Sequence, residues 1–132
     1  MDFAALNTKA AAEKGAFLHL RHPATKALLW DGEGATRIAV GVTVRGTESK
    51  TVQAVLKRLQ KDRMDAGDAD DGLAYVVALV MGFTGIHRDG VLLCDATDND
   101  ARWFFGLSDG FIEQVTEFAR DGASFFKPAT TA

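Results

Sequence analysis

The stretch TRIAVGVTVRGTESKTVQAVLKRLQK, residues 36–61, changes its hydrophobic period half-way, and this change indicates the fold class. Up to Gly46, apolar and polar residues alternate, which is typical of a strand with one buried face. The residues that share this face are Ile38, Val40, Val42 and Val44. From Thr47 onward the apolar residues recur at helical spacing, at Val52, Val55, Leu56 and Leu59. An amphipathic helix capped by Thr47 or Ser49 is therefore predicted.

Residues before this stretch have the same alternating character. AFLHLRHP (16–23) places Phe17, His19 and Arg21 on one side, and KALLW (26–30) follows after Pro23. DGEG (31–34) is typical of a turn, and NTKAAAEKG (7–15) fits a short helix. We expect a single α+β domain over residues 1–132, with a small antiparallel sheet of about three strands in a strand-rich N-terminal region, residues 1–46.

The mainly helical region is expected to cover residues 47–126. An acidic flexible segment at about 62–72 carries five aspartates, and LAYVVALVMGF (73–83) is predicted to be a buried helix. HRDGVLL (87–93) fits a short extended piece around an Asp-Gly turn. Thr97 and Ser108 are the predicted N-caps of the last two helices, and Gly122 is the predicted end of the second.

Charge and composition argue against several classes of function. The net charge is −3, which disfavours a nucleic-acid binder, and the chain has a single cysteine. The N-terminal residues lack a long apolar run, so we expect no signal peptide, no membrane span and a cytoplasmic protein. The helix from Lys50 has a basic face, KTVQAVLKRLQKDR (50–63), which we interpret as solvated surface, with contact to an acidic partner as the alternative.

Candidate catalytic and metal-binding residues are few. The aspartates before Leu73 do not match a calcium loop, and His19 and His22 point to opposite faces of a strand. Cys94 with His87 and Asp95 would allow a small cysteine-dependent enzyme, but a lone cysteine after an apolar run more often behaves as a buried hydrophobe. We therefore predict no catalytic, metal or cofactor residues.

The last third of the chain has more aromatic residues than one helix pair needs for a core. They are Trp103, Phe104, Phe105, Phe111, Phe118, Phe125 and Phe126. Either these rings wrap the sheet and the central helix, or some of them form an apolar surface for another polypeptide. For the second case the predicted partner-binding residues are Trp103, Phe104, Phe111, Phe118, Phe125 and Phe126.

Four segments of the chain together form a recognisable pattern: LNTKAAAEKGAFLHLRHPATKALL (6–29), GTESKTVQAVLKRLQKDRM (46–64), GFTGI (82–86) and FIEQVTEFARDGASFF (111–126). Through these segments, most of the chain resembles the tail assembly chaperones of long-tailed bacteriophages and prophages. The residues of the last segment that match the family pattern are Phe111, Ile112, Gln114, Val115, Asp121, Ala123 and Phe125. Gly110, Gly122 and Ser124 depart from it, where proline, arginine and asparagine are common.

The resemblance implies a non-enzymatic protein that binds the tape measure protein, recruits tail-tube subunits and is absent from the mature virion. It also implies helix-in-groove recognition, possible homo-oligomers, and no nucleic-acid or membrane partner. Two alternatives stay open. One is a structural tail or head–tail joining protein, and the other is the Cys94 enzyme.

Overall fold

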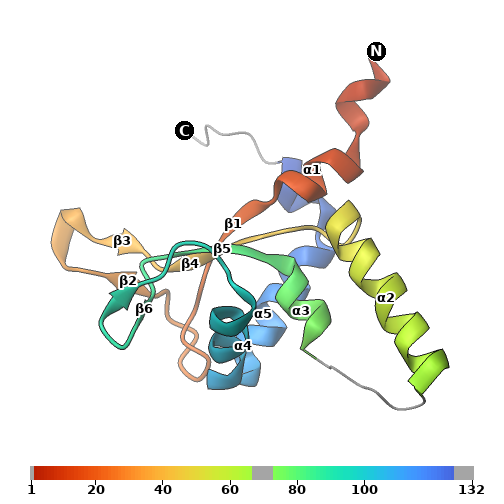
Figure 1. Cartoon of the computed structure of the whole chain (residues 1–132). Coiled ribbons are helices and arrows are strands. Elements are labelled where there is room, and N and C mark those ends of the chain that lie inside the picture. Colours follow the sequence, from red (N-terminus) through yellow and green to blue (C-terminus); the bar gives the residue numbers. More distant parts are fainter. Residues whose placement is uncertain (1, 67–72, 127–132) are drawn as a thin grey trace.

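The computed structural model describes residues 2–66 and 73–126 (Figure 1). The elements in chain order are η1 (Phe3–Leu6), α1 (Thr8–Lys14), β1 (Ala16–His19), β2 (Trp30–Asp31), η2 (Gly34–Thr36), β3 (Ile38–Ala39), β4 (Gly41–Val44), α2 (Lys50–Ala66), α3 (Ala74–Leu79), β5 (Val80–Thr84), β6 (His87–Arg88), β7 (Val91–Leu92), α4 (Asp98–Leu107), α5 (Asp109–Arg120) and η3 (Gly122–Phe126). The expected acidic segment is helical up to Ala66, because α2 continues that far, and its remainder, 67–72, lies outside the described residues.

The main sheet is antiparallel with the strand order β1-β4-β5, which confirms the predicted α+β class and the number of strands. Phe17 lies opposite Thr43 on one side of β4, and Phe83 lies opposite Val42 on the other. Val42 and Val44 are fully buried, as their alternation predicts. β4 is therefore the central strand, and it connects the N-terminal region to the helical region.

The origin of the third strand differs from the prediction. Residues 73–83 do not form one buried helix, because α3 ends at Leu79 and the chain continues directly into β5. Periodicity cannot distinguish a short buried helix from a buried strand when nearly every residue is apolar. Pairing with β4 makes residues 80–84 a strand. Gly82 allows this strand to lie close to the Cys94 carbonyl oxygen, because a Cβ atom at this position would lie only 3.0 Å from that oxygen.

Two short hairpins extend from the same end of this sheet (Figure 1). KALLW joins the first hairpin and not the main sheet, because Trp30 pairs with Ala39 in β3, and the DGEG turn lies between these strands as predicted. β6 and β7 form the second hairpin around Asp89 and Gly90. Both turn residues have positive φ, 50° and 81°, as in the type I′ turn that Asp-Gly favours.

Helices α3, α4 and α5 pack together and against the sheet, and the core lies between these layers. Thr97 caps α4 by accepting a hydrogen bond from the Asp100 amide, and Ser108 caps α5 by accepting one from the Gly110 amide, both as predicted. α5 ends at Arg120, two residues before Gly122. The side chain of Gln114 holds α5 against the chain after β1, since it accepts from the Arg21 amide and donates to the Arg21 carbonyl.

Candidate functional site

Two of the C-terminal aromatic residues, Phe104 and Phe105, lie in the interior of the domain. Phe104 is only 2% exposed, and its ring stacks on Phe111 with centroids 4.8 Å apart. Phe83 from β5 and the neighbouring Phe105 complete this cluster. Because Phe104 contacts side chains of its own domain on these sides, it contributes no free surface, and its assignment as a partner contact stays a prediction.

The other predicted contact residues keep some of their surface. Trp103 is half-buried beneath the Arg88 guanidinium, and Phe118 meets the ring of Phe125 edge-on at 5.6 Å. Phe111 is likewise half-buried against the core. The assignment of Phe126 falls outside the side chains that the structure describes. For Trp103, Phe111, Phe118 and Phe125, partner contact stays a prediction.

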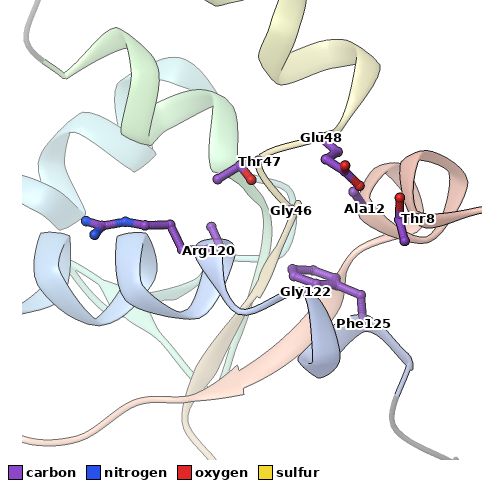
Figure 2. A pocket seen from close by; sticks show the side chains of 9 residues that line it. Thr8, Ala12, Gly46, Thr47, Glu48, Arg120, Gly122 and Phe125 are labelled. Carbon is purple, nitrogen blue, oxygen red and sulfur yellow. The ribbon is translucent and has the colours of Figure 1, made fainter.

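Phe125 lines a crevice of about 340 Å³ between α1, η3 and the loop before α2 (Figure 2). The loop passes close to α1 at Gly46, where a Cβ atom would lie 2.8 Å from the Ala12 Cβ and 3.3 Å from the Phe125 ring. The Gly46 amide also donates to the Ala12 carbonyl. Thr8 and Arg120 complete opposite walls of the crevice. Phe125 thus joins the C-terminal end to α1.

A carboxylate holds α1 to the start of α2 at the same place. Glu13 accepts hydrogen bonds from the hydroxyl groups of Ser49 and Thr51 and from the Thr51 amide, and the Arg45 Nε atom lies 3.8 Å away. The pKa of Glu13 is lowered from 4.5 to about 2. The main cause is hydrogen bonding from the Ser49 and Thr51 hydroxyl groups, and the Thr51 amide and Arg45 add to it. The sequence predicts Ser49 as a cap of this helix, but it does not predict the contact with Glu13.

This contact predicts a pH-dependent contribution to stability. Because the folded pKa lies below the unfolded value, the contribution is complete above pH 4.5 and declines as the pH falls toward 2. About two fifths of the Glu13 side chain is exposed, so after solvent screening we expect about 1 to 2 kcal/mol. Urea denaturation of the wild type and Glu13→Gln should differ by this amount at pH 6 and converge near pH 2. A difference that is equal at both pH values would contradict this role.

An exposed row of rings crosses from β1 to the first hairpin. His19 lies between Phe17 and Trp30, with centroid distances of 6.5 and 4.7 Å, and the Arg37 guanidinium covers Trp30 at 3.8 Å from the ring centre. The His19 Nε2 atom lies 2.7 Å from the Leu29 carbonyl oxygen, which fixes the orientation of the ring between its neighbours. Trp30 nevertheless remains 40% exposed.

We call the exposed apolar side chains of β1 and of the two hairpins the hairpin surface. It has more than one face, because Trp30 pairs with Ala39 and Ile38 with Asp31, which places Trp30 and Ile38 on opposite faces of the first hairpin. It contains most of the exposed large apolar side chains in the described ranges, namely Phe17, Leu28, Trp30, Ile38, Val91 and Leu92. Gly85, just before β6, lies against Asp31 and Val40, so the two hairpins start from neighbouring positions. Exposed apolar side chains on neighbouring elements are typical of protein contact surfaces.

The hairpin surface was not predicted from the sequence, because aromatic residues are most frequent in the last third of the chain. The available signal was the alternation in residues 16–22, which already placed Phe17 and His19 on the side opposite Leu18 and Leu20. The structure buries Leu20 and leaves Phe17 exposed. Ile38 was predicted to share the buried face of Val42 and Val44. It lies instead in β3 and is 53% exposed.

Cys94 was expected to be a buried hydrophobe, but its side chain is exposed. The reason is local alternation beside β5, where Leu93 points inward and the Cys94 carbonyl accepts a hydrogen bond from the Phe83 amide. His87 and Asp95 are exposed as well. Among the side chains that the structure describes, no group of three or more from histidine, cysteine, aspartate and glutamate could hold a metal ion.

Comparison with models of known protein families, with curated proteins and with solved structures gives no match to this chain. Within the described ranges, none of the helices combines the length and the apolar character that crossing a membrane requires. The functional interpretation therefore depends on the surfaces described above and on the residues that resemble the tail assembly chaperones.

Proposed function

We propose that the protein is a phage or prophage tail assembly chaperone, which binds the tape measure protein and helps to recruit tail-tube subunits in the host cytoplasm. The observation that carries this proposal is the hairpin surface, where Phe17 and Trp30 are exposed on either side of His19. A chaperone that keeps an apolar client apart from other molecules needs such a surface. The proposed role includes no bond-breaking step.

The residues that resemble the family have a structural role in this chain. Val115 is fully buried, Gln114 fixes the backbone of Arg21, and Phe125 packs on Phe118 near Gly46. This segment therefore stabilises the domain that presents the hairpin surface. The resemblance supports the proposal through the fold, while the exposed hairpins supply the contacts with a client.

Co-expression with the tape measure protein of the same phage tests the proposal. We expect the two proteins to co-purify and the soluble fraction of the client to rise, because the chaperone covers the client's apolar segments. Unchanged client solubility together with no co-purification would contradict the proposal. Mass spectrometry of purified particles then separates a chaperone, which should be missing, from a structural tail or head–tail joining protein.

A further inference from the structure

An open groove of about 700 Å³ runs between α1 and the first two turns of α2. The two helices lie next to each other at one end of the molecule (Figure 1), and the Glu13 contact with Ser49 and Thr51 holds them there. The lining includes Ala10 from α1 and Ala54 from α2, both exposed. Such small side chains allow a partner to approach both helices closely.

Basic charge is concentrated along this groove. Lys9 lies on the α1 side, while Lys50 and Lys57 lie on the α2 side, and all three are exposed. Residues 50–61 of α2 contain four basic residues and no acidic residue, although the whole chain carries a net charge of −3. The groove therefore has a positive local potential on a molecule that is otherwise acidic.

The acidic residues of the lining do not cancel this charge. The lining has three lysines and two glutamates, and the Arg45 Nε atom lies 3.8 Å from the ionised Glu13 carboxylate, so the basic charge exceeds the acidic charge. Lysine side chains also add apolar stems to the groove walls while their ammonium groups stay at the rim. A matching ligand has an apolar stripe flanked by carboxylates.

We infer that this groove binds an acidic amphipathic helix of a partner polypeptide. The inference rests on the proposed function and specifies the chemistry of the client segment. α1 has seven residues and is about 10 Å long, so the contact involves about two turns of the partner helix. Glutamates on both flanks of the bound stripe reach Lys9 on one side and Lys57 on the other, which sets the orientation of the helix.

The direct test uses a synthetic amphipathic helix of about 18 residues, long enough to be helical in water, with a leucine and alanine stripe flanked by glutamates. The control peptide carries lysine in place of glutamate. Fluorescence anisotropy at low salt should show at least about tenfold tighter binding of the glutamate peptide, and this preference should decline with added salt. Equal affinities of the two peptides would overturn the inference.

Matched variants separate the groove from general charge. Lys9→Glu with Lys57→Glu should weaken binding of the glutamate peptide by at least about tenfold. Lys14→Glu with Lys61→Glu changes the same charge on the same two helices outside the groove and should have an effect below about threefold. Equal losses in both double variants, with circular dichroism showing folded proteins, would overturn the inference.

A steric pair needs no change of charge. Ala54→Trp fills the groove and should abolish peptide binding, whereas Gln60→Trp, on the same exposed face of α2 but beyond the groove, should retain it. Wild-type binding by Ala54→Trp would contradict the proposed site. Analytical ultracentrifugation tests whether a second copy of the chain covers the groove. A wild-type dimer that the double variant Lys9→Glu/Lys57→Glu converts to a monomer would show this, and it would overturn the inference.

Co-purification with the tape measure protein distinguishes this inference from the proposed function. The double variant Lys9→Glu/Lys57→Glu can lose binding of the peptide and still retain the client. In that case the groove is not the client site, so the inference fails while the proposed function stands. If the wild type fails to retain the client, the proposed function fails whatever the peptide does. Loss of both ligands by the double variant, with both retained by the control variant, supports the inference.

Discussion

Replacing Phe104 with alanine is expected to lower the free energy of unfolding by about 3 to 5 kcal/mol. The ring is 2% exposed and contacts Phe83, Phe105 and Phe111, so its removal leaves a cavity that the surrounding rings and strands cannot fill completely. Urea denaturation followed by circular dichroism measures the effect. For a domain of this size, a loss of several kcal/mol removes a large fraction of the total stability.

Leu107→Ala on the same helix is the matched control. This side chain is 56% exposed, and its truncation should change stability by less than about 1 kcal/mol. If Phe104→Ala instead folded as stably as the control and lost only its client, the ring would be a contact residue and its placement in the core would be wrong. The comparison therefore decides between the two interpretations of the C-terminal aromatic residues.

Trp30→Ala is expected to have the opposite pattern, with a folded domain and a loss of client binding of about tenfold or more. Trp30 lies at the end of the exposed ring row, between His19 and Arg37, and presents the largest apolar side chain of the hairpin surface. Large aromatic side chains in such positions dominate the binding energy of many protein interfaces. Titration of the purified variant against the tape measure protein measures the loss.

The control for Trp30→Ala is again Leu107→Ala, which removes an exposed apolar side chain away from the hairpins. It should bind the client like the wild type. Unchanged client affinity of Trp30→Ala would exclude the ring row as the contact. The next candidate contact would then be Phe125 in the crevice beside α1. Val91→Ser or Val91→Thr would extend the test to the second hairpin.

Local features were predictable because each depends on residues only a few positions apart. The stripe in residues 52–59 predicted α2, and the Thr97 and Ser108 hydroxyls cap their helices by bonding to amides two or three residues ahead. The Asp89-Gly90 pair formed its hairpin for the same reason, since it permits positive φ at both positions. The α+β class followed from the change of period at residue 47.

The arrangement in space depended on contacts between distant residues. Phe83 pairs with Val42 across the sheet. This pairing makes residues 80–84 a strand, although their composition also suits a helix. Phe104 becomes buried because β5 supplies Phe83, while Trp30 stays exposed because its hairpin leaves the main sheet. Ser49 and Glu13 are 36 residues apart in the sequence, and only the packing of α1 against α2 brings them together.

The sequence by itself determined the fold class, most helices with their caps, and the second hairpin, since hydrogen bonds and steric limits within a few residues specify them. Only the tertiary structure decided which strand completes the sheet, which aromatic rings are covered, and that Lys9 and Lys57 line one groove. Strand pairing and burial are properties of segments that meet in space, and the order of residues along the chain does not specify which segments meet.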